Sequence, residues 1–241
     1  MIVSYGAGVN STAMILLLLE RKEPIEAIVF ADTGAERPVS LDYLAYFADW
    51  LKTTHGIEIV RVRREGEGLP DYCRRYNFIP SRLFRWCTDK FKVRPLTAWK
   101  LEHYPGATDA IGFDCGESHR MLSGKNAQGR RVCYPLIEAG LDRDGCVSVI
   151  RTAGLRVPEK SGCWLCPFQR LEQWAELEVS HPDLFARAIE LERVAAERSD
   201  GTYVFGRDKW DTLDKRVARF RKKKCSMRDL WDNERPCGCI E

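Results

Sequence analysis

The amino-acid sequence predicts an α/β protein with a doubly wound, mostly parallel five-stranded sheet and a C-terminal helical extension that carries cysteines. Two observations support this prediction. Short apolar stretches typical of strands alternate with stretches of helical periodicity as far as Leu155, and this alternation is typical of parallel sheets. From Gly162 onward only helical periodicity remains. We therefore expect an α/β domain over residues 1–160 and a helical region over residues 161–241.

The elements are expected in the following order along the chain. Strands are expected at residues 1–3, 27–31, 57–62, 108–113 and 132–137. Helices are expected where apolar residues recur at helical spacing, at residues 12–21, 41–51, 89–102, 142–155, 171–179, 181–198 and 208–224. Residues 63–88 are irregular and rich in arginine, so we expect them to form a loop excursion over the active face of the sheet.

A glycine-rich stretch, Ser4–Thr12, follows the first strand and opens the first helix. Small residues at such a junction let the backbone approach a ligand closely, and the N–H groups and positive end of the helix favour a phosphate. Position 5 is Tyr and no Lys follows Gly8, so the dinucleotide and Walker A patterns are both excluded. The alternative interpretation is an ordinary junction between a strand and a helix.

The composition indicates an ordinary globular protein of 241 residues, 44% of them hydrophobic and 30% charged. No apolar run reaches the ~20 residues that span a bilayer, and no signal-peptide pattern precedes the loop, so we expect a cytoplasmic protein without a membrane partner. The net charge of +3 does not by itself indicate a nucleic-acid partner. The basic stretch Lys209–Lys224 is either a solvated amphipathic helix or a surface that follows a nucleic-acid backbone.

Ten cysteines in a reducing compartment indicate metal or redox chemistry rather than a set of disulfides. Cys163 and Cys166 are separated by two residues, so both thiolates can reach one ion. A site with four ligands needs two further thiolates, for which the candidates are Cys87, Cys225, Cys237 and Cys239. Three other cysteines lack a neighbour at such spacing and are expected to be buried, inert thiols: Cys73, Cys133 and Cys146.

Charged residues at the expected carboxyl ends of the strands are candidates for chemistry. Asp32 ends the second strand beside the loop, where a carboxylate could hold Mg²⁺ or a substrate hydroxyl. The alternative for Asp32 is a turn or a helix cap. Lys92 and Arg120 lie near the same expected edge, where a fixed cation could offset the charge on a phosphate. For Arg94 we favour an ordinary surface position.

Several stretches resemble the phosphoadenylylsulfate (PAPS) reductase-like family of the PP-loop ATP pyrophosphatases, over about residues 1–170. Gly6–Ser11 is similar to the S-G-G-x-D-S loop, Ala31–Gly34 to the strand-end D-T-G, and Arg85–Leu96 to a cysteine followed by K-V-x-P-L. Ile111–Arg120 is similar to G-x-R-x-x-E-S-x-x-R, and Pro135–Ile137 to P-L-I. In the loop, Asn10 stands in place of the Asp and Ala7 in place of the middle Gly.

The resemblance implies that the chain binds ATP and Mg²⁺ and adenylylates an acceptor, releasing AMP and pyrophosphate. The modification would be sulfur transfer from an unspecified donor, or a related reaction, with a nucleic acid as one candidate acceptor. The residues implied to bind the nucleotide are Ser4, Tyr5, Gly6, Ala7, Gly8, Asn10, Ser11, Thr12, Asp32, Thr33 and Gly34. The residues implied to be catalytic are Asp32, Lys92 and Arg120.

The resemblance also implies a [4Fe–4S] cluster. Its ligands would be Cys87, Cys163 and Cys166, with Cys225 as the expected fourth ligand. Cys237 or Cys239 is the alternative fourth ligand, and zinc is the alternative metal because four thiolates suit it equally well.

Two other functions remain as alternatives. The first is thiol-dependent reduction of a sulfonucleotide, with Cys237 or Cys239 as the nucleophile. Against this function, the E-C-G-L-H tail of the reductases is absent, and Trp86 precedes Cys87 where assimilatory enzymes carry adjacent cysteines. The second is a non-catalytic module that keeps the fold and binds nucleic acid or another partner.

Overall fold

The computed structural model describes residues 1–122, 124–126, 129–198, 204–206, 208 and 210–231, with side chains as far as residue 223. The chain forms two compact units, each assembled from two segments. The first unit comprises Met1–Gly68 and Cys87–Cys163, and the second comprises Leu69–Trp86 and the chain from Trp164 onward. The predicted boundary at residue 160 falls near the end of the first unit, whereas the sequence did not indicate that Leu69–Trp86 belongs to the second.

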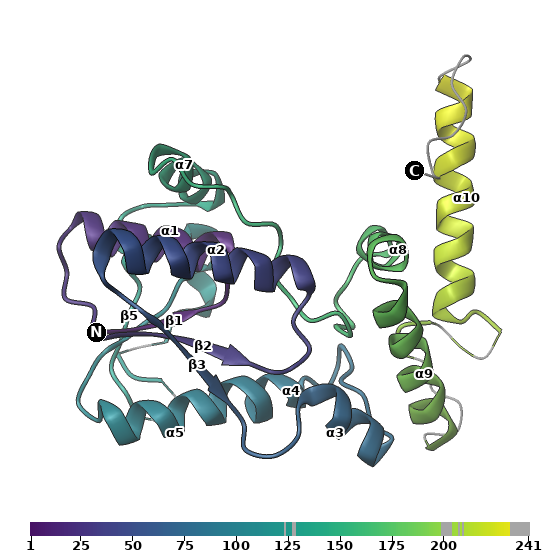
Figure 1. The fold of residues 1–241 in the computed structure, drawn as a ribbon, viewed down its shortest axis with the longest axis horizontal. Helices are drawn as coiled ribbons and strands as arrows, with labels where there is room; N and C mark the ends of the chain where they lie inside the picture. The colour runs from purple at the N-terminus through teal and green to yellow at the C-terminus, as the bar shows by residue number, and fades with distance from the viewer. Residues whose placement is uncertain (123, 127–128, 199–203, 207, 209, 232–241) are drawn as a thin grey trace. The chain divides into compact units, whose positions relative to one another are not determined.

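The first unit is built on a five-stranded sheet in which every pair of neighbouring strands is parallel (Figure 1). The strands are β1 (Ile2–Tyr5), β2 (Ala27–Asp32), β3 (Ile59–Arg63), β4 (Asp109–Ala110) and β5 (Val132–Cys133). Their order is β3-β2-β1-β4-β5, which confirms the predicted fold class. Since the order reverses between β1 and β4, the carboxyl end of β1 lies at the position where such sheets bind ligands.

Helices cover both faces of this sheet. Helices α1 (Val9–Glu20), α2 (Pro38–His55) and α7 (Arg143–Thr152) lie on one face, and α5 (Arg94–His103) lies on the other (Figure 1). Side chains of a strand alternate between the two faces of the sheet. Val3 packs in the core formed with α1, α2 and α7, and Ile2 packs on the face covered by α5. The central strand β1 is therefore buried on both sides and fixes the start of the glycine-rich loop.

Three predictions for the first unit and its neighbouring segment were wrong in detail. Residues 63–88 are not irregular throughout, because α3 (Leu69–Tyr76) forms where Leu69, Pro70 and Cys73 are buried. The strand expected at residues 132–137 ends at Cys133 and is followed by the short helix α6 (Pro135–Glu138); proline has no N–H for a sheet ladder but suits the first turn of a helix. The helix expected at residues 89–102 begins as a π-helix, Asp89–Val93.

The second unit is helical. It contains α3, α8 (Leu171–Ser180), α9 (Pro182–Arg198) and α10 (Leu213–Trp231), and the single turn α4 (Trp86–Thr88) lies at its border. Helix α8 packs against α9 and α10, and α3 packs against α9. Helix α10 begins at Leu213 rather than at the predicted residue 208. Among the helices that the structure describes, none combines the length and apolar character needed to cross a membrane.

Candidate functional site

A pocket of about 540 Å³ lies at the glycine-rich loop of the first unit. It is formed where β1 ends, where α1 begins with Gly8 as its N-cap, and where the segments after β4 and before Cys163 approach. The lining residues are Ser4, Gly6, Gly8, Val9, Asn10, Ser11, Lys92, Gly112, Phe113, Glu117, Arg120, Arg143, Lys160 and Ser161. The volume is within the range of sites for small ligands.

Hydrogen bonds within the loop fix its shape. Ser11 Oγ accepts from the Gly6 N–H (3.2 Å) and lies 3.2 Å from the Gly8 carbonyl oxygen, to which it donates. Thr12 Oγ1 donates to the same carbonyl (2.9 Å). Ala7 adopts a left-handed conformation with φ of 51°, which alanine adopts at some cost and which the surrounding bonds stabilise. The loop is therefore held in one conformation around the start of α1.

Two glycines give the pocket its depth. A Cβ atom placed on Gly8 would lie 2.8 Å from Ser161 Oγ, and one placed on Gly112 would lie 3.4 Å from Ser11 N and Cα. The pocket is thus a cradle of backbone that a larger residue would fill. The first turn of a helix presents N–H groups without intrahelical acceptors, so this cradle fits a phosphate group.

Asn10 connects three parts of the site. Its Nδ2 donates to Asp114 Oδ2 (2.9 Å) and to Glu117 Oε2 (3.2 Å), while its Oδ1 accepts from Arg143 NH1 (2.9 Å). Arg120 is bonded to Glu117 and lies 4.3 Å from the centroid of the Phe113 ring. An amide can donate and accept at once, so Asn10 serves two carboxylates and a cation in a way that the aspartate of the related loop could not.

The pocket is electropositive. Its described lining contains four cationic side chains, Lys92, Arg120, Arg143 and Lys160, and one carboxylate, Glu117. Cations in a cleft, together with the positive end of α1, raise the local concentration of anions. The arrangement suits a ligand with several negative charges.

The strand-end residues Asp32, Thr33 and Gly34 form a neighbouring cluster and are not in the described lining of this pocket. Asp32 Oδ1 accepts from the Gly34 N–H (2.8 Å), and buried Thr33 Oγ1 donates to Glu36 Oε1 (2.7 Å). Lys92 Nζ lies 4.0 Å from the same Glu36 oxygen. Lys92 therefore connects the pocket with the end of β2. Of the other predicted loop residues, Tyr5, Ala7 and Thr12 are buried behind the lining.

Cys163 lies beside this strand end. Its Sγ is 3.8 Å from Thr33 Oγ1, and Cys163 forms an antiparallel bridge with Glu36. Cys87 belongs to the same unit, whereas Cys166 belongs to the second unit. The side chain of Cys225 and all of Cys237 and Cys239 lie outside the described residues. Among the side chains described, no three His, Cys, Asp or Glu residues are arranged to hold a metal ion, so the cluster stays a prediction.

Two of the cysteines without a spaced neighbour are poor nucleophiles. Burial, the largest effect, raises the pKa of both Cys133 and Cys146 to about 11. Nearby carboxylates, Glu138 for Cys133 and Asp114 for Cys146, act in the same direction. Since the thiolate is the reactive form, these positions fit the inert role predicted for them.

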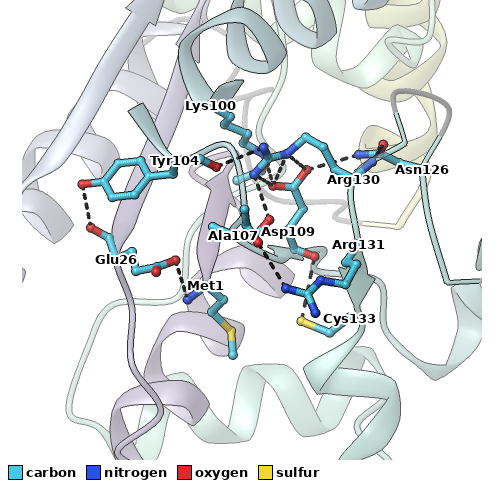
Figure 2. A network of polar contacts seen from close by, with 12 residues as sticks. Met1, Glu26, Lys100, Tyr104, Ala107, Asp109, Asn126, Arg130, Arg131 and Cys133 are labelled. Atoms are coloured by element: carbon cyan, nitrogen blue, oxygen red, sulfur yellow. Dashed lines mark hydrogen bonds and ion pairs between the residues drawn. The ribbon is translucent and has the colours of Figure 1, made fainter. Parts of the chain in front are cut away.

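A buried network of charges lies next to the pocket (Figure 2). Asp109, at the start of β4, accepts from Arg130 Nε (3.1 Å) and Asn126 Nδ2 (3.2 Å), and Lys100 Nζ lies 3.2 Å away. Lys100 also donates to Ser4 Oγ (2.9 Å), a lining atom of the pocket. Burial lowers the pKa of Lys100, and the Asp109 carboxylate opposes that effect. Lys100, Asp109 and Arg130 are only 4–5% exposed, so two cations share one carboxylate in the interior.

Residues 1–113 match the family model of the phosphoadenosine phosphosulfate reductase domain. The N-terminal part of the chain is therefore similar to the PAPS reductase-like family. A curated relative, the uncharacterized protein MJ0066 of Methanocaldococcus jannaschii, is 30% identical over 111 residues. The aligned part is 46% of this chain and 21% of that relative, so this chain spans about a fifth of the relative's length.

Of two similar solved structures, the PAPS reductase supports the fold. The PAPS reductase from Candida auris, solved as a phosphate complex, has a TM-score of 0.50 and 14% identity, covering 68% of this chain and 82% of that one. The U34-tRNA thiolase NcsA from Methanococcus maripaludis, solved with its [4Fe-4S] cluster, has a TM-score of 0.49 and 18% identity, covering 80% and 71%.

Seven lining residues were not predicted as site residues from the sequence: Val9, Gly112, Phe113, Glu117, Arg143, Lys160 and Ser161. The first four lie within stretches that carried the resemblance, whereas the last three do not. Arg143 opens α7 and reaches Asn10 from a helix distant in sequence, so local pattern gave no signal. Lys160-Ser161-Gly162 directly precedes Cys163. This small polar stretch before a candidate metal ligand was a signal that could have identified Lys160 and Ser161 as site residues.

Proposed function

We propose that this protein is an ATP-dependent PP-loop enzyme that adenylylates an acceptor for sulfur transfer, with AMP and pyrophosphate as products. The observation that carries the proposal is the electropositive pocket at the N-terminus of α1, where the glycine cradle and four cations line one cavity. The match of residues 1–113 to the phosphoadenosine phosphosulfate reductase domain supports an adenine nucleotide as the ligand.

In the proposed reaction, the first turn of α1 holds the phosphates of ATP. An oxygen of the acceptor attacks the α-phosphorus, and the bond to the bridging oxygen breaks, so the electron pair leaves with pyrophosphate. Lys92 and Arg120 offset the charge that develops on the leaving group. A sulfur nucleophile then displaces AMP from the activated acceptor. Asp32, at the end of β2, would hold the ribose or Mg²⁺, which neutralises phosphate charge when bound.

The site favours cleavage between the α- and β-phosphates over transfer of the γ-phosphate. A Walker A lysine, which reaches the β- and γ-phosphates, has no equivalent in the loop sequence Gly6–Thr12. The cations of this pocket come instead from other elements: Lys92 from the π-helix, Arg120 from the turn after β4 and Arg143 from α7.

We expect that ATP labelled at the α-phosphate, incubated with the protein, bulk cellular RNA and sulfide, is converted to AMP with equimolar pyrophosphate. Chromatography of the products measures this. An Arg120→Met variant should be slower by about 10²-fold or more, because it loses a cation that stabilises the transition state. ADP as the main product would contradict the proposed cleavage, and a lack of AMP release with RNA and sulfide present would favour the non-catalytic alternative.

We also propose that Cys87, Cys163 and Cys166, with Cys225, bind a [4Fe–4S] cluster. The observation that supports it is the position of Cys163 beside Thr33 at the end of β2, next to the strand that carries the loop. The donor set of thiolates suits iron–sulfur clusters and zinc alike. No step of the proposed reaction depends on the cluster.

Metal analysis of anaerobically purified protein tests this proposal. Cys163→Ala should lose most of its iron and sulfide, whereas the control Cys133→Ala, which replaces a thiol with a pKa of about 11, should keep them. Zinc without iron in the wild type would replace the cluster with a zinc site. Equal metal content in Cys163→Ala and the wild type would contradict both.

A further inference from the structure

The second unit carries a surface rich in exposed aromatic and arginine side chains. We call it the aromatic–arginine surface, and it consists of Tyr76, Phe78, Arg82, Phe84, Arg85 and Phe168. All six side chains are exposed, and Phe84 keeps 60% of its side chain in solvent. Leu83, between Arg82 and Phe84, is fully exposed. Large apolar groups that gather on one surface in this way mark a binding site more often than chance exposure does.

The rings of this surface are ordered by one another. Phe78 stacks on Trp86 with ring centroids 5.4 Å apart and planes 15° apart, and Phe84 lies 6.4 Å from Phe78. Phe168 comes from a distant part of the sequence. The guanidinium carbon Cζ of Arg85 lies over its ring, 5.0 Å from the centroid of the Phe168 ring. Flat rings are therefore held in place with at least one face or edge in solvent.

The two arginines of the surface contact neutral groups. Arg82 Nε donates to the carbonyl oxygen of Pro167 (2.9 Å), and Arg85 lies over the Phe168 ring. Both of these partners are neutral. Arg74 of the same segment, which is not part of this surface, pairs with Glu190 (3.2 Å), so the positive charge of the surface comes from Arg82 and Arg85. The surface therefore attracts anions while it also offers rings for stacking.

We propose that the aromatic–arginine surface binds single-stranded nucleic acid, with bases stacked on its rings and phosphates paired with Arg82 and Arg85. Proteins that bind single strands combine these two features, because every base has a stacking face and every nucleotide has a charge. Bases in a duplex are already stacked on each other, so a duplex has no free base faces on which these rings could stack. The proposal depends on the proposed function only in naming the class of acceptor.

The basic helix α10 is a weaker candidate for the same partner. Two of its described arginines are paired with acids of the same unit: Arg219 pairs with Asp211, and Arg221 NH1 lies 2.9 Å from Glu178 Oε2. Neutralised cations contribute little to the release of counterions, which drives binding to phosphates.

Fluorescence anisotropy with a labelled single-stranded oligonucleotide, as RNA and as DNA, and with the matched duplex, tests the proposal. Phe84→Ala should weaken binding of the single strand by about 5- to 100-fold, since one stacking contact is lost. Arg85→Ala should weaken binding and lower the slope of log affinity against log salt by roughly 0.7. Phe84 is exposed, so its truncation should leave the melting temperature unchanged.

Two matched controls lie elsewhere on the second unit. Val179→Ala removes another exposed apolar side chain from α8, and Arg193→Ala removes a cation that pairs with Glu197 on α9. Both should bind the oligonucleotides as the wild type does. RNA bound more tightly than DNA would identify the acceptor class as RNA, and the reverse as DNA; either supports the proposal.

Three results would overturn it. The first is equal affinity of Phe84→Ala, Arg85→Ala and wild type for the single strands. The second is tighter binding of the duplex that is insensitive to Phe84→Ala. The third is self-association of the wild type that Phe84→Ala abolishes, which would make the surface an interface with a second copy. ATP affinity, measured on the same variants, should stay unchanged, so failure of ATP cleavage and failure of oligonucleotide binding are separate outcomes.

Discussion

A Gly8→Val variant should fold normally and lose ATP binding by at least about 100-fold, roughly 3 kcal/mol. Even a Cβ atom at this position would lie 2.8 Å from Ser161 Oγ. The serine hydroxyl is the end of a short side chain that can rotate away, so the fold should tolerate the change. The two methyl groups of valine would then occupy the cradle that we assign to a phosphate.

Isothermal titration calorimetry with ATP and Mg²⁺ measures the loss. Gly106→Val is the matched control, because no atom lies within 4 Å of a Cβ placed there and Gly106 is not among the described lining residues. Wild-type affinity in a folded Gly8→Val variant would rule out the loop as the nucleotide site. Loss of affinity in Gly106→Val as well would show that the effect is not local.

An Asp109→Asn variant should lose about 3–5 kcal/mol of the free energy of unfolding. The substitution keeps the shape of the side chain but leaves Lys100 and Arg130 buried without their shared counter-charge (Figure 2). Burial already lowers the pKa of Lys100 in the native protein. Without the carboxylate that opposes this effect, the cost of keeping Lys100 charged rises.

Urea unfolding followed by circular dichroism measures the change. The control is Asp89→Asn. Asp89 pairs with Arg94 at 2.6 Å, and both side chains are exposed. Such a surface pair should contribute less than about 1 kcal/mol to the free energy of unfolding. Adding Lys100→Met to Asp109→Asn should restore part of the lost stability, because one uncompensated charge is removed. Equal stability of Asp109→Asn and the wild type would mean that the network is not a stabilising element.

The sheet and the position of the loop could be predicted from the sequence because both depend on local pattern. Alternating strand and helix periods fixed the parallel sheet, and the glycines between Ser4 and Ser11 marked the junction at its edge. Gly6, Gly8 and Lys92 line the pocket. Their positions could be predicted because they lie on or next to elements whose order was evident from the sequence.

Contacts between distant segments could not be predicted. Lys100 lies in a helix whose sequence reads as an ordinary polar surface, yet it is 5% exposed because Asp109 and Ser4 accept from it. The role of Asn10 depends on Arg143, which is remote in sequence. In both cases the position of a polar side chain depends on a hydrogen-bond or ion-pair partner from a distant segment. Hydrophobic periodicity does not indicate which distant residues form such pairs.

The composition of the second unit from two separate segments has a consequence for how the chain folds during synthesis. Helix α3 packs against α9, but the ribosome must add roughly 100 more residues after α3 before α9 begins, which takes on the order of 5–20 s. During that interval the first unit can complete its sheet, while α3 remains without the helix α9 against which it later packs. The segment Leu69–Trp86 therefore stays without its packing partners longer than any other part of the second unit. During that time it can bind chaperones or form non-native contacts.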